Sequence, residues 1–175
     1  MSGTSTSANR HDGRPQRMGW PKTLGLLAAG RNINPETLLA TDYLNHFNEI
    51  VMLIDMLADM PDCIGDIQAW EPLSYCEHFE RSHFADRDLA VLAYENAPTK
   101  HREPFDIVVA QANRVAREAT QTLAAAVAED ASGKIAVLGA QYAGMLRRLI
   151  DMASGIINGN GLRMDQREID AILAQ

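Results

Sequence analysis

Apolar residues recur at helical spacing in four stretches of the chain, and this pattern predicts an all-α protein. In the first stretch, residues 35–60, they step by four and three positions, which lines them up on one face of a helix. These residues are Tyr43, Phe47, Ile50, Ile54 and Leu57. Asn34 and Pro35 suit the start of this helix, and Pro61 suits its end. No stretch alternates apolar and polar residues over a useful strand length.

The second stretch ends before Pro98 and contains two places where a helix can start. Ser74 and Glu77 have the spacing of a capping box, and Asp86 is a second candidate N-cap. We therefore expect two helical pieces with a break near residues 84–86. The connection before them has space for a single helical turn.

Two further stretches complete the pattern. Pro104 suits the start of the third helix, expected over residues 102–130, and residues 135–158 form the fourth. Their apolar stripes are Phe105, Val108, Ala112, Val115, Ala119 and Leu123 in the third, and Leu138, Tyr142, Met145, Leu149, Met152 and Ile156 in the fourth. Four amphipathic segments joined by short loops predict an antiparallel four-helix bundle.

The bundle is expected over residues 32–158, between two segments of different composition. Residues 1–31 are rich in Ser, Thr, Gly and Arg, and they predict a disordered or partly docked tail. Residues 159–175 start with a Gly/Asn hinge and continue into a short amphipathic segment, which predicts a C-terminal docking helix.

Charge is unevenly distributed and narrows the choice of partner. The formal net charge is −7, and residues 1–31 contain five Lys or Arg against one acidic residue, so the remainder carries −11. An acidic body argues against nucleic acid as a partner. No apolar run approaches the roughly 20 residues that a membrane span requires. Cys63 and Cys76 form no CxxC pair, which favours a reducing, cytoplasmic location.

The C-terminal segment has a helix pattern of its own. Asp165 is a candidate N-cap, and Glu168 completes a capping box. Ile169, Ile172 and Leu173 fall on one face, with Met164 at the entry. A helix this short is marginal alone in water, so it must dock on its own body or in the groove of a partner.

The closing stretch MDQREIDAILAQ resembles the N-terminal peptide by which the flagellar motor switch protein FliM binds the phosphorylated chemotaxis response regulator CheY. That peptide reads approximately Ser/Asp-Gln-x-Glu-Ile-Asp-Ala-Leu-Leu. Ile172 matches as a similar apolar residue, and the identities are Gln166, Glu168, Ile169, Asp170, Ala171 and Leu173. The resemblance implies that Ile169, Ile172 and Leu173 enter the regulator's groove. Glu168 and Asp170 would then face its basic residues.

The position of this peptide differs from that in the switch protein, because here it follows the helical region instead of preceding it. The layout is analogous to the chemotaxis phosphatase CheZ, in which a helical bundle is followed by a linker and a regulator-binding helix. The resemblance therefore implies a chemotaxis or motility protein that recruits a CheY-like regulator, as an adaptor or as a phosphatase. The alternative interpretation is a fifth helix that packs on the bundle.

A phosphatase of this kind presents an acidic residue and an amide from one helix face. The amide orients the attacking water, and the acid holds the regulator's active-site lysine or metal shell. Two pairs have the required spacing of one turn: Glu118 with Gln121, and Asp42 with Asn45.

A divalent-metal site is the alternative from another functional class. His46 and Glu49 share a stripe on the first helix, and Glu80 and His83 have the Glu-x-x-His spacing of di-metal carboxylate bundles. His46 is also a candidate phosphate acceptor. A third alternative is a structural helical protein without catalytic function, whose alanine-rich faces suit a homodimer.

Overall fold

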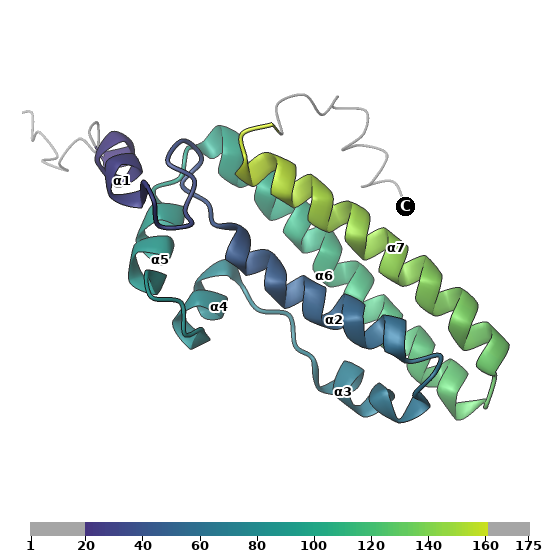
Figure 1. Cartoon of the computed structure of the whole chain (residues 1–175). Coiled ribbons are helices and arrows are strands. Elements are labelled where there is room, and N and C mark those ends of the chain that lie inside the picture. Colours follow the sequence, from purple (N-terminus) through teal and green to yellow (C-terminus); the bar gives the residue numbers. More distant parts are fainter. Residues whose placement is uncertain (1–19, 161–175) are drawn as a thin grey trace, which may run out of the picture.

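A computed structural model describes residues 20–160, of which 75% are helical. Seven α-helices and no strand lie within these residues, so the all-α prediction is confirmed (Figure 1). Residues 1–19 of the tail predicted over residues 1–31, and the docking helix predicted over residues 164–173, lie outside the described part of the chain.

Three long helices lie side by side along the molecule: α2 (Asn45–Met56), α6 (Thr99–Ala128) and α7 (Ser132–Ile157) (Figure 1). α6 and α7 form an antiparallel hairpin, and α2 packs against α7. The whole predicted stripes of the first and third stretches are buried between them. This burial of apolar surface is the main stabilising term of the fold.

The second stretch forms two short helices, α4 (Tyr75–Arg81) and α5 (Arg87–Glu95), with the break where the sequence predicts it. The capping box is present: the Ser74 hydroxyl accepts from the Glu77 N–H at 3.3 Å, and the Glu77 carboxylate accepts from the Ser74 N–H at 2.9 Å. Asp86 does not cap α5 with its side chain and instead binds Arg31 at 2.5 Å. Because these two helices are short, the antiparallel four-helix bundle is not confirmed.

The first helix is shorter than predicted at both ends. Asn34 accepts from two N–H groups as an N-cap would, but Leu38 has φ +60° and turns the chain back. A single 3-10 turn, η1 (Thr41–Leu44), then leads into α2. α2 ends at Met56, and Pro61 starts a second 3-10 turn, η2 (Pro61–Cys63), followed by α3 (Ile64–Ala69). The predicted range 35–60 is therefore wrong in its first ten and last four residues.

The long hairpin differs from the prediction in register. α6 begins at Thr99, so Pro104 lies inside the helix rather than at its start. On α7, three of the six positions predicted to be buried are replaced in the core by the residue that follows each of them. Leu138, Met145 and Met152 are only half-buried, whereas their small or aliphatic neighbours Gly139, Leu146 and Ala153 are buried. A Cβ on Gly139 would lie 3.5 Å from the Ile54 carbonyl oxygen, so this small position allows α2 and α7 to approach closely.

The first described helix, α1 (Trp20–Ala28), packs onto α5. Its residues Leu24 and Ala28 are fully buried. Gly25 faces the backbone of Pro35 so closely that an added Cβ would lie 2.5 Å from the Pro35 carbonyl oxygen. The end of the predicted tail is thus part of the packed structure.

Candidate functional site: a polar cleft at the start of α2

A polar cleft of about 480 Å³ lies between the start of α2 and the last third of α7. Asn and Asp side chains dominate its lining, with two hydroxyls and two apolar residues: Asn32, Thr41, Asp42, Leu44, Asn45, Asn48, Ile150, Asp151 and Ser154. A second hollow of about 230 Å³ shares Asn32 and Thr41 and extends to Asn158 at the end of α7. Among the lining residues, the sequence predicts Asp42 and Asn45 as a functional pair. It does not predict that the other lining residues join them.

Asp42 and Asn45 face the same cleft because of the 3-10 turn between them. In a 3-10 helix, side chains three residues apart eclipse each other. The Asn45 N–H bonds back to the Asp42 carbonyl, which closes this turn. Asp42 is half-buried and Asn45 is exposed, and Asn48 follows one turn later on α2. This wall of the cleft therefore presents the Asp42 carboxylate and two amides in a row, opposite Asp151 and Ser154 of α7.

The other predicted pair lies elsewhere. Glu118 accepts a hydrogen bond from the Tyr142 hydroxyl at 3.2 Å, and Gln121 is exposed on α6. Tyr142 is nine residues before Asp151 on α7, which is about 13 Å of helix. The two acid–amide pairs therefore belong to different surfaces, and only Asp42 with Asn45 lines the cleft.

His46 does not line the cleft, and its contacts with Trp70 and Leu73 give it a structural role. Its Nε2 accepts from the Leu73 N–H at 3.1 Å, and its ring stacks on Trp70 with 4.5 Å between centroids. The Trp70 indole N–H donates to the His46 carbonyl at 3.2 Å. Burial, aided by nearby His78, lowers the pKa of His46 to about 4. A buried neutral imidazole with its Nε2 engaged is not available as a metal ligand through that atom or as an exposed phosphate acceptor.

The other predicted metal ligands do not assemble with it. Glu49, Glu80 and His83 are all exposed. Within residues 20–160, no three His, Cys, Asp or Glu side chains are grouped so that they could hold a metal ion. Cys63 and Cys76 are free thiols.

Aromatic residues hold the loop that forms one wall of the cleft. The Tyr43 hydroxyl donates to the Leu73 carbonyl at 2.8 Å, and the Tyr75 hydroxyl accepts from the Ala40 N–H at 2.8 Å. Burial raises the pKa of both tyrosines. The Thr37 hydroxyl donates to the Ile157 carbonyl at 2.7 Å and ties the same loop to the end of α7. These bonds fix Asp42 in position relative to α7.

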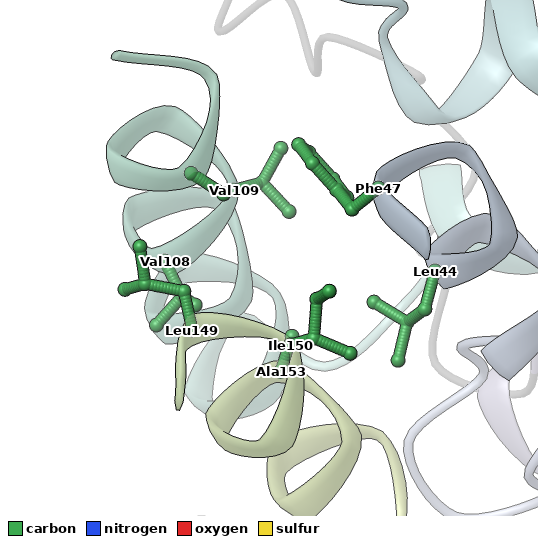
Figure 2. A pocket seen from close by; sticks show the side chains of 8 residues that line it. Leu44, Phe47, Val108, Val109, Leu149, Ile150 and Ala153 are labelled. Carbon is green, nitrogen blue, oxygen red and sulfur yellow. The ribbon is translucent and has the colours of Figure 1, made fainter. Parts of the chain in front are cut away.

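An apolar crevice lies where the three long helices meet (Figure 2). It has no polar lining and is too narrow for a water molecule. Its lining is Leu44, Phe47, Val108, Val109, Ala112, Leu149, Ile150 and Ala153. Leu44 and Ile150 also line the polar cleft, so the floor of the cleft is the protein core. The crevice is therefore a packing gap in the core and not a ligand site.

The described chain ends beside this cleft. Asn158 lines the second hollow, and the Asn160 N–H donates to the Gly155 carbonyl at 2.8 Å. All partner-binding residues predicted from the sequence follow this point and lie outside the described residues: Met164, Gln166, Glu168, Ile169, Asp170, Ile172 and Leu173.

None of the helices described for residues 20–160 combines the length and apolar character needed to cross a membrane. Comparison with known proteins finds no matching family model, no matching curated protein and no matching solved structure.

Proposed function

We propose that this protein is a cytoplasmic chemotaxis or motility adaptor that binds a CheY-like response regulator through residues 164–173. The observation that carries the proposal is the match of six residues in this segment to the regulator-binding peptide of the switch protein. Apolar residues at 169, 172 and 173 would fill a groove of the regulator, as in other complexes in which a helix docks through one apolar face.

The position of the polar cleft supports this proposal. Met164 follows Asn160 by four positions, and a fully extended chain spans at most about 14 Å between them. A regulator held by the C-terminal segment therefore stays close to the end of α7. Tethering at such short range gives a high effective concentration at neighbouring surfaces, including the cleft.

A pull-down with a CheY-like regulator activated by a phosphate mimic tests the adaptor function. The full chain is compared with a chain that ends at Gly161. We expect the full chain to retain the activated regulator and the shortened chain to lose it. Equal retention by both chains, or retention by neither, contradicts the proposal.

Dephosphorylation of the bound regulator is a second candidate function, favoured by the shared cleft of Asp42 and Asn45. The Asn45 amide would orient a water molecule towards the phosphorus of the regulator's aspartyl phosphate. The water oxygen forms the new P–O bond as the bond to the aspartate oxygen breaks. Inorganic phosphate is released, and the regulator keeps its free aspartate carboxylate. The Asp42 carboxylate would hold the regulator's lysine or metal shell during this step.

A further inference from the structure

Three methionines form an exposed row along the outer face of α2 and the turn that follows it. Met52, Met56 and Met60 are spaced by four residues and are 56%, 38% and 46% exposed. The Met60 N–H donates to the Met56 carbonyl at 2.9 Å, so Met60 lies one turn beyond Met56, after the end of α2. At 100° per residue, Met52 and Met56 lie opposite the buried Phe47 and Ile54. We call Met52, Met56 and Met60 the methionine ridge.

The ridge lies in a strongly acidic part of the chain. Residues 32–80 contain ten Asp or Glu and no Lys or Arg. Glu49 lies one turn before Met52 on the same face, and Asp59 and Asp62 follow Met56. All three carboxylates are exposed, and they form no ion pair within the described part of the chain.

One carboxylate of this acidic region forms an ion pair within the described residues. Asp55 lies on the side of α2 that faces α7, and it pairs with Arg147. Glu49, Asp59 and Asp62 therefore place unpaired negative charge at the two ends of the methionine ridge, although carboxylates away from the ridge, such as Asp42 and Asp66, also form no ion pair in the described residues. An apolar row with free carboxylates at both ends is complementary to an apolar helix face flanked by Lys or Arg.

We propose that the methionine ridge is a docking surface for a basic amphipathic helix of another protein. Methionine side chains are flexible and polarisable, and surfaces rich in them accept helices of varied sequence. The carboxylates at the ridge ends select a positively charged partner and speed its encounter. This surface is separate from the C-terminal segment of the proposed function, and its test does not depend on that function.

The sequence of this chain argues against its own segments as the occupant. Residues 164–173 carry three acidic residues and one Arg, so their charge repels the acidic ridge. Residues 1–19 carry three Arg but contain no Leu, Ile, Val or aromatic residue to cover the methionines. The ridge of a second copy has the same negative charge. A partner with basic and apolar residues together is the occupant that fits.

Fluorescence anisotropy with the full chain tests this surface. The probe is a labelled helical peptide of about 14 residues, in which leucine and lysine follow the repeat Leu-Lys-Lys-Leu-Leu-Lys-Leu. We expect saturable binding that weakens with salt. The triple variant Met52→Gln, Met56→Gln, Met60→Gln should bind at least about tenfold more weakly. Its matched control, Leu26→Gln with Val137→Gln, changes apolar residues that are 80% and 68% exposed elsewhere and should bind as the wild type does.

Several results would overturn the proposal. One is no binding of the probe, or equal binding by the triple variant. Another is equal binding of a peptide with the same composition in scrambled order, which would reduce the effect to charge alone. Ridge-dependent binding of peptides 1–19 or 161–175 would assign the ridge to this chain. A dimer mass by light scattering that the triple variant abolishes would assign it to a second copy.

Discussion

His46 illustrates how the role of one residue depends on contacts that its local sequence does not contain. Its spacing from Glu49 predicts metal ligands on one stripe of a helix. In the folded chain its Nε2 instead accepts a hydrogen bond from Leu73, 27 residues away, and its ring stacks on Trp70. Helical periodicity reports which residues share a face, but it contains no information about which loop covers that face.

The lowered pKa of His46 predicts a loss of stability in acid. In the unfolded chain a histidine titrates near pH 6.5, whereas burial lowers the pKa of His46 to about 4 in the folded protein. The contribution of His46 to the free energy of unfolding is therefore complete above pH 6.5. It is lost as the pH falls towards 4, because the unfolded chain binds the proton first. The loss over this range is on the order of 3 kcal/mol.

Urea unfolding at pH 7 and at pH 4.5 measures this effect. The variant His46→Gln keeps an acceptor but cannot be protonated, so its free energy of unfolding should fall less between the two pH values. His78 and His101 also have lowered pKa values in the folded protein. They are present in both proteins, so part of the loss of stability in acid should remain in the variant. Identical declines in wild type and variant would show that His46 does not carry this effect.

At the scale of elements, the sequence predicts helices well where apolar side chains are large and less well where they are small. The α2 and α6 stripes contain Phe, Ile, Val and Leu, and the predicted faces are the buried ones. On α7 the close contact with α2 uses Gly139, which no hydrophobic pattern selects. The turn before α2 is set by Leu38 at φ +60°, a conformation that is rare for leucine and is held by tertiary contacts.

The close packing of α1 predicts a specific effect of adding one methyl group. In Gly25→Ala the new Cβ would lie 2.5 Å from the Pro35 carbonyl oxygen, so α1 or the loop must move. We expect a destabilisation of about 1–3 kcal/mol, with faster amide exchange in α1. Gly144→Ala in α7 is the matched control, since no atom lies within 4 Å of the new Cβ.

In this control, alanine should stabilise the helix by about 0.5–1 kcal/mol. Thermal unfolding and hydrogen exchange of the two variants give the comparison. A Gly25→Ala protein as stable as the wild type would contradict the observed docking of α1.

At the scale of the whole molecule, the polar cleft combines residues that lie more than one hundred positions apart. Asp42 comes from η1 and Asn45 from the start of α2, whereas Asp151 and Ser154 come from α7. Their spacing within each helix is visible in the sequence, but their meeting depends on the loop that Thr37 ties to Ile157. The proposed partner, by contrast, is inferred from one contiguous segment, residues 164–173. The sequence alone is therefore enough to suggest it.

The cleft makes a prediction about turnover. If the second candidate function holds, the full chain should accelerate loss of the phosphoryl group from a CheY-like regulator. Asn45→Ala and Asp42→Ala should each slow this accelerated rate by about tenfold or more, because the water and the regulator's cation lose their positioning groups. Gln121→Ala, the amide of the other pair, should leave the rate unchanged.

The rate is followed by release of inorganic phosphate, with binding of the regulator measured in parallel. Asn45 is exposed, so its substitution should not disturb the fold. Unchanged rates in both cleft variants would exclude the cleft as the dephosphorylating surface while leaving the adaptor function intact.

The central claim is that the C-terminal segment recruits the regulator, and calorimetric titration of a beryllofluoride-activated CheY-like regulator tests it most directly. Ile169→Asp places a charge on the apolar face, whereas Arg167→Ala changes a residue outside the matched positions. We expect saturable binding by the wild type and Arg167→Ala, and at least about tenfold weaker binding by Ile169→Asp. Equal affinity of all three proteins, or no binding by the wild type, would contradict the account.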